Sequence, residues 1–205
     1  LSKCCFTRSP VIENIDELGE YDEKLIHLFT VNCLEFPDLY KVREQKAILV
    51  EIGPERLVHV LQLLGRSISS DTESAGKYWK NRIKPFIKRA WPKEDRYITE
   101  ESSKYFALIS IELHDHFEEV IEFLRIFIRP TSDLFHFLNR LDNGNLPDKK
   151  PRATFRLLCL VFSEEYRGPS EILRKILDRI IAADPSIRTV SGYRQIDDYL
   201  IQRGL

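Results

Sequence analysis

Apolar residues in this chain recur mainly at intervals of three and four, and prolines separate the segments that show this spacing. One such run ends just before Pro37: Leu25, Ile26, Leu28, Phe29, Cys33 and Phe36. Because an α-helix repeats every 3.6 residues, this spacing forms one apolar face, and no segment of any length alternates as a strand would. The chain has only 8 Gly. The pattern predicts an all-α fold of antiparallel helical hairpins, either a bundle or a short HEAT-like α-solenoid.

Several residues are expected to set the helix boundaries in the first half. Asp38 is a candidate cap for the segment that follows it. The apolar stripe of that segment is irregular: Leu39, Val42, Ala47, Leu49 and Val50. Gly53 and Pro54 should begin the next helix, with proline in its first turn, and Gly65 should end it.

The second half contains one strong turn signal. Thr99 is expected to cap a long apolar-periodic segment that should break between His114 and Phe117, since an unbroken helix would exceed the usual length. After the turn DNGN at 142–145, helices are expected at about 152–162, after Gly168-Pro169 and at about 191–202. This turn predicts a helical N-terminal subdomain, 1–142, and a helical C-terminal subdomain, 143–205, packed on it; one continuous domain is the alternative.

Charge and composition restrict the function classes. Lys and Arg total 31 and Asp and Glu 32, so the net charge of −1 provides no general attraction to polyanions. No stretch approaches the roughly 20 apolar residues of a membrane span, and no signal peptide is evident. The 4 Cys are too few for a disulfide framework, which favours a cytoplasmic protein. No cofactor-binding or metal-binding motif occurs, so neither a cofactor nor a metal is expected. Because the sequence lacks Met and starts at Leu1, we expect it to be the C-terminal part of a longer protein.

The segment AGKYWKNRIKPFIKRAWPK, residues 75–93, is strongly basic and holds both tryptophans. On a helix, one sector is apolar: Trp79, Ile83, Phe86 and Ala90. The aromatic and basic residues are segregated, whereas a single-strand binding platform needs both in one groove. A capping box at Ser70 and Glu73 should begin this helix, and Pro85 should either kink it or split it into two short helices. The candidate polyanion-binding residues are Lys77, Lys80, Lys84, Lys88 and Arg89.

Two sets of residues are candidates for catalysis. Arg129 and His136, separated by six residues, have a spacing similar to the R-x(4–6)-H motif of HEPN ribonucleases, although Pro130 follows the arginine where a polar residue is usual. The HDH sequence at 114–116 is similar to the ligands of HD-type phosphohydrolases, with His59 and either Asp178 or Asp184 as the remaining ligands. However, His114 and His116 differ by about 200° on a helix and cannot both face one metal. No metal site is therefore predicted.

A W-x6-F-x4-W-P pattern, formed by Trp79, Phe86, Trp91 and Pro92, accompanies the ending IDDYLIQRGL. Together they resemble the C-terminal helical regions of large multidomain bacterial proteins, some with a sirtuin-type or NTPase domain and a role in anti-phage defence. The resemblance implies a helical-repeat appendage that senses, scaffolds or oligomerises.

Two functions stay open. The first is a non-enzymatic interaction or scaffolding domain whose partner is another protein or an upstream domain of the same polypeptide. The second is a nucleic-acid-linked module, either a basic-helix binder or a HEPN-like ribonuclease.

Overall fold

The computed structural model describes the backbone of residues 15–69 and 72–205, and their side chains except at 15–21, 69, 72 and 73. This part of the chain is helical and contains no β-strand, only an isolated bridge between Thr131 and Phe162. The prediction of an all-α fold is confirmed. None of the helices in these ranges is both long and apolar enough to cross a bilayer.

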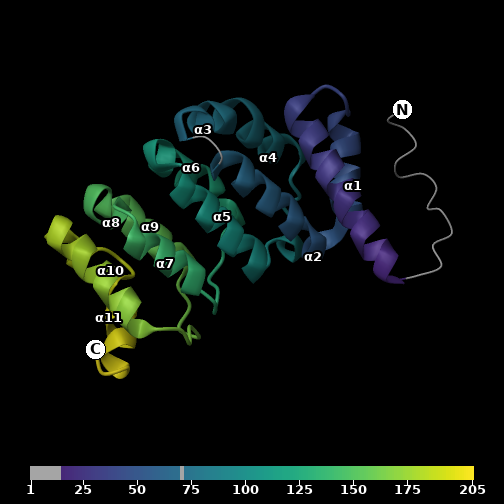
Figure 1. Ribbon diagram of the computed structural model, residues 1–205. Coiled ribbons are helices and arrows are strands. Elements are labelled where there is room, and N and C mark those ends of the chain that lie inside the picture. The colour runs from purple at the N-terminus through teal and green to yellow at the C-terminus, as the bar shows by residue number, and fades with distance from the viewer. Residues whose placement is uncertain (1–14, 70–71) are drawn as a thin grey trace.

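The helices pack in a sequence of neighbours (Figure 1). α1 (Ile15–Glu35) packs on α2 (Val42–Ser69), and α2 packs on α5 (Glu100–Glu112). α5 in turn contacts α7 (Phe135–Asn143), which contacts α10 (Ser170–Ala183). Each of these helices therefore buries its apolar face against the next one, as in a stacked helical array.

Shorter helices cover this row. α3 (Thr72–Tyr78) and α4 (Lys84–Ala90) both contact α2. α6 (Phe117–Leu124) packs on α5. The remaining helices are α8 (Leu146–Lys149), α9 (Pro151–Val161) and α11 (Tyr193–Gln202). In Figure 1, α3, α4 and α6 lie along one side of α2 and α5.

The predicted start of α2 is wrong. The backbone amide of Leu39 donates to the carbonyl of Phe36 at 2.9 Å, which closes a turn around Asp38, and α2 begins only at Val42. The Glu44 carboxylate accepts from the amide of Lys41 at 2.9 Å and takes the capping role. Four members of the predicted stripe are exposed, Leu39, Val42, Ala47 and Val50, and only Leu49 is buried.

Gly53 interrupts α2 and Pro54 begins its second helical segment, as predicted, whereas Gly65 does not end it. Gly53 has φ of +79°, a left-handed conformation that glycine adopts without strain, and Pro54 begins the following segment. Gly65 lies inside the helix, which continues to Ser69. The apolar face of α2 continues to Ile68, which is 1% exposed, so packing keeps the chain helical past the glycine.

Several predicted boundaries are confirmed. The Thr99 hydroxyl accepts from the amide of Ser102 at 3.1 Å and caps α5. The expected break occurs at the 3₁₀ turn η3 (His114–His116). α9 and α11 lie within two residues of their predicted ranges.

Contacts cross the proposed subdomain boundary at 142. This position falls in the last turn of α7, followed by a turn at Gly144 and Asn145. Arg179 of α10 donates to the carbonyls of Asp142 and Gly144, both at 2.7 Å, and pairs with Asp148. The Arg179 side chain therefore contacts residues on both sides of the predicted boundary.

The basic segment 75–93 is a helix interrupted by a π-helical turn, η1 (Trp79–Ile83). Its predicted apolar sector is fully buried: Trp79, Ile83, Phe86 and Ala90 are each 0% exposed. The inward orientation of the aromatic residues is confirmed. The proposed capping box at Ser70 and Glu73 lies outside the described residues and side chains.

Candidate interaction surfaces

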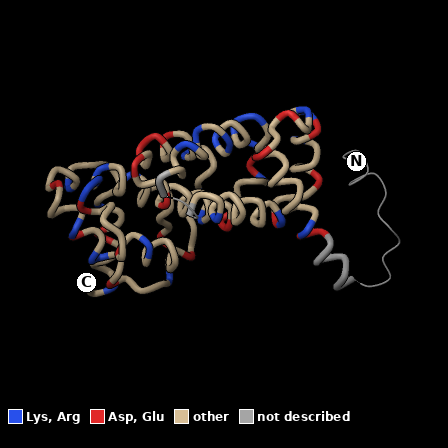
Figure 2. The backbone as a smooth tube through the Cα atoms, turned by 45° about the horizontal axis from the view of Figure 1, so that its top comes forward, with Lys and Arg blue, Asp and Glu red and all other residues tan. Residues whose placement is uncertain are grey.

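Basic side chains follow the outer side of α3, η1 and α4. Figure 2 shows Lys and Arg positions along the edge of the molecule where these helices lie. Lys77, Lys80 and Lys88 are exposed, whereas Lys84 and Arg89 are half-buried. The five predicted polyanion-binding residues therefore differ in how accessible they are to a ligand.

Lys84 is neutralised within the fold. Its ammonium donates to the Glu119 carboxylate of α6 at 2.6 Å and lies 5.5 Å from the centre of the Phe123 ring. The hydrogen bond from Lys84 holds the pKa of Glu119 below its usual value. Lys84 therefore joins α4 to α6, and its charge is already paired.

Lys88 and Arg89 line a cavity of about 640 Å³ between α4 and the first part of α2. Lys46 and Lys93 also line it, and sequence periodicity did not select either of them. Lys93 follows shortly after the end of α4, whereas Lys46 lies on α2 and is placed beside Lys88 only by tertiary packing. The cavity is completed by Ala47, Val50, Ala90, Trp91, Pro92 and Glu94.

The candidate ribonuclease residues each have a local environment of their own. The Arg129 guanidinium lies 3.5 Å from the Asp95 carboxylate and donates to the carbonyl of Ile128 at 3.3 Å. His136 is exposed in the first turn of α7, where its ring packs edge-on against Phe135 at 5.6 Å. No cavity described here is lined by either residue.

The described residues offer little for metal or thiolate chemistry. No group of three or more His, Cys, Asp or Glu side chains among them could hold a metal ion. Asp184, one of the HD-type candidates, caps η5 (Pro185–Thr189) and pairs with Arg152 at 2.7 Å. Burial raises the pKa of Cys33 to about 12 and of Cys159 to about 11, so both thiols are protonated at neutral pH.

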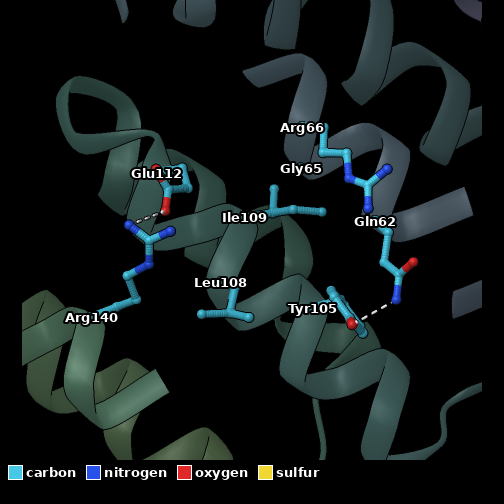
Figure 3. A pocket seen from close by; sticks show the side chains of 8 residues that line it. All are labelled: Gln62, Gly65, Arg66, Tyr105, Leu108, Ile109, Glu112 and Arg140. Atoms are coloured by element: carbon cyan, nitrogen blue, oxygen red, sulfur yellow. Dashed lines mark hydrogen bonds and ion pairs between the residues drawn. The ribbon is translucent and has the colours of Figure 1, made fainter. Parts of the chain in front are cut away.

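A groove crosses α2, α5 and α7, with a volume of about 590 Å³ (Figure 3). Gln62 and Arg66 come from α2, and Arg140 from α7. Figure 3 shows Leu108 and Ile109 of α5 between these two sides. No sequence motif marks this groove, because its residues belong to three separate segments.

Polar contacts hold the sides of this groove in place. The Gln62 amide donates to the Tyr105 hydroxyl at 2.8 Å, and the Arg140 guanidinium lies 3.6 Å from the Glu112 carboxylate, both shown as dashed lines in Figure 3. Arg66 is exposed and has no ion-pair partner among the described residues. The groove therefore offers a free guanidinium beside the apolar Leu108 and Ile109.

Arg66 also lines a second cavity, of about 300 Å³, between α1 and α2. Val31 of α1 and Tyr78 at the end of α3 belong to this cavity. The Tyr78 hydroxyl donates to the Glu35 carboxylate at 2.8 Å. The two cavities have Arg66 as a common lining residue. We call the two cavities together the α1–α7 groove.

Comparisons with known proteins identify one distant similarity. No protein-family model matches the sequence, and no solved structure matches it. The chain is 24% identical over 111 residues to the uncharacterized protein y4cA of Sinorhizobium fredii (strain NBRC 101917 / NGR234). The matched region is 53% of this chain and 9% of that protein. The chain thus spans a small share of this much longer relative.

Proposed function

We propose that this chain is a non-enzymatic helical interaction domain that binds an extended segment of a partner protein in the α1–α7 groove. The observation that carries this proposal is that two neighbouring cavities have Arg66 as a common lining residue. Their lining residues come from α1, α2, α3, α5 and α7, and stacked helical proteins commonly bind extended partner segments across several helices.

The chemistry of the groove suits a polypeptide. Val31 and Leu108 provide apolar contacts, and Gln62 and Tyr105 provide hydrogen-bonding groups for a peptide backbone. Arg66 has a charge available for a partner carboxylate. Apolar contacts with a few polar groups between them are typical of binding sites.

A random-peptide display selection on the purified chain tests this proposal. Leu108 is half-buried on the groove, and its replacement in Leu108→Arg adds a charge and bulk there. We expect the selected peptides to bind Leu108→Arg at least about tenfold more weakly, measured by fluorescence anisotropy. The matched control is Ile126→Arg, since Ile126 is 49% exposed and does not line the groove. Peptides that bind Leu108→Arg as tightly as the parent would refute the proposal.

The much greater length of the y4cA protein supports the further proposal that this domain works within a larger polypeptide. An upstream domain of the same chain is then one candidate for the bound partner. A cytoplasmic location and a role in bacterial defence are proposals that rest on the cysteine usage and on the family resemblance described above.

The nucleic-acid alternative is supported by Lys77 and Lys88, which are exposed and have no ion-pair partner among the described residues. A mobility shift that weakens steeply with salt would favour it, and the absence of binding at low salt would exclude it. For the ribonuclease form, RNA cleavage should disappear in His136→Ala while the circular dichroism spectrum is unchanged.

A further inference from the structure

The cavity between α2 and α4 concentrates positive charge that the fold does not neutralise. Four cationic side chains line it, against the single carboxylate of Glu94: Lys46, Lys88, Arg89 and Lys93. None of the four has an ion-pair partner within the described part of the chain. Other cations are paired, as in Lys84 with Glu119 and Arg174 with Asp197. Since the whole chain has a net charge of −1, this excess is local.

The helix dipole accounts for only part of this cluster. Lys88 and Arg89 lie in the last turn of α4, where cations interact favourably with the helix carbonyls. Lys46 belongs to α2, and Lys93 follows the end of α4. The dipole of α4 therefore does not explain why Lys46 and Lys93 line the same cavity as Lys88 and Arg89.

Arg89 lacks an acceptor. Its Nε is buried and has no hydrogen-bond partner among the described residues. Burying a charged donor without an acceptor costs free energy, so such groups usually have a partner. An anion bound in the cavity next to the Arg89 side chain would provide compensating charge.

The remaining lining is apolar. Ala47 and Val50 are exposed, with Val50 at 42%, while Pro92 is buried. Trp91 is 2% exposed and packs edge-on against Phe106 at 5.3 Å. A base could not stack on the face of so deeply buried a ring, whereas an aliphatic side chain can rest on Val50 and Ala47. The ligand should therefore combine carboxylates with an apolar group.

We infer that the cavity lined by Lys46, Lys88, Arg89 and Lys93 binds an acidic peptide segment in which carboxylates flank an apolar side chain. This site is separate from the α1–α7 groove: the two surfaces have no lining residue in common. Charge complementarity selects the acidic flanks, and Val50 with Ala47 receives the apolar side chain.

The test uses a fluorescein-labelled peptide with one leucine between runs of glutamate, and fluorescence anisotropy with the purified chain. We expect binding that weakens as salt is raised, and that weakens about tenfold or more in Lys88→Gln and in Lys93→Gln. Both residues are exposed, so these variants should fold, which circular dichroism checks. A peptide with glutamine in place of glutamate should not bind, and one with serine in place of leucine should bind more weakly.

The matched control is Lys77→Gln, which removes the same charge from the same basic segment outside the cavity. An equal loss in Lys77→Gln would overturn the inference, since it would indicate diffuse attraction to the basic surface. Binding of a single-stranded RNA but not of the acidic peptide would also overturn it, as would the absence of any peptide binding at low salt. Leu108→Arg should leave this affinity unchanged, so a failure of this site and a failure of the groove can be told apart.

Discussion

The backbone amide of Lys84 donates to the carbonyl of Trp79, five residues earlier, immediately before Pro85. Proline has no amide hydrogen, and in a regular α-helix its ring would clash with the carbonyl four residues before it. The π-helical turn before Pro85 is wider than an α-helical turn, because its hydrogen bond spans five residues instead of four. The chain therefore continues as a helix through Pro85, and the apolar face also takes in Ile87 and Trp91, at 0% and 2% exposure.

Trp79 should be a major contributor to stability. Its side chain is 0% exposed and packs edge-on against Phe123 at 5.8 Å. Trp79→Ala would leave a large cavity and should lower the free energy of unfolding by about 3–5 kcal/mol, measured by urea denaturation. The Nε1 of Trp79 has no hydrogen-bond partner in the described part of the chain, so Trp79→Phe loses only packing and should cost clearly less. Equal losses for the two variants would contradict this account.

Two glycines should respond to alanine in opposite directions. At Gly168 an added Cβ would lie 2.3 Å from the Tyr166 hydroxyl and 2.5 Å from its ring, and this ring is 1% exposed. Gly168→Ala should destabilise by about 1–3 kcal/mol through overpacking. At Gly65, within α2, the nearest atom would be 3.9 Å away, so Gly65→Ala should stabilise the helix by about 0.5–1 kcal/mol. Thermal unfolding of both variants checks the two signs.

Glu100 should contribute to stability only above acidic pH. Its carboxylate accepts from the amide and hydroxyl of Ser132 at 2.9 and 3.0 Å, and these bonds hold its pKa below the usual value. Because the folded pKa is depressed, the contribution is present above the unfolded pKa of about 4.3 and is lost as pH falls through the folded pKa. Glu100→Gln should thus be less stable than the parent at pH 7.

The stability difference between the parent and Glu100→Gln should shrink toward zero as the pH falls below about 4, in urea denaturation at a series of pH values. A difference that stays constant from pH 7 to pH 3 would show that the charge of Glu100 is irrelevant.

Arg179 should link α10 to the end of α7. It donates to the carbonyls of Asp142, in the last turn of α7 where helix carbonyls lack intrahelical partners, and of Gly144, which follows α7, and its side chain is 24% exposed. Arg179→Ala should lower the free energy of unfolding by about 1–3 kcal/mol. Lys175, which also pairs with Asp142 but is 64% exposed, is the control, and Lys175→Ala should cost less than about 1 kcal/mol. Similar losses in the two variants would show that the carbonyl contacts are unimportant.

The sequence predicted those parts of the fold that depend on local periodicity and capping. Trp79, Ile83 and Phe86 recur at helical spacing and are buried together, and Thr99 caps α5 through its hydroxyl. The predicted start of α2 was wrong, because Asp38 resembles a helix cap in the local sequence. In the structure the capping contact is made by Glu44, whose carboxylate accepts from the amide of Lys41. Boundaries depend on small differences between alternative caps, and a single sequence does not rank them.

Local sequence determined that this chain is helical, where most helices lie and which face of the basic segment is buried, because these follow from the 3.6-residue period and from side-chain bonds within one turn. The tertiary structure alone decided which cations are paired and which are free. Lys84 meets Glu119 from another helix, while Lys88 meets Lys46 and Lys93 around a cavity. Glu119 and Lys46 are distant in sequence from these lysines, so only the packing of helices brings their charges close enough to pair or to form a site.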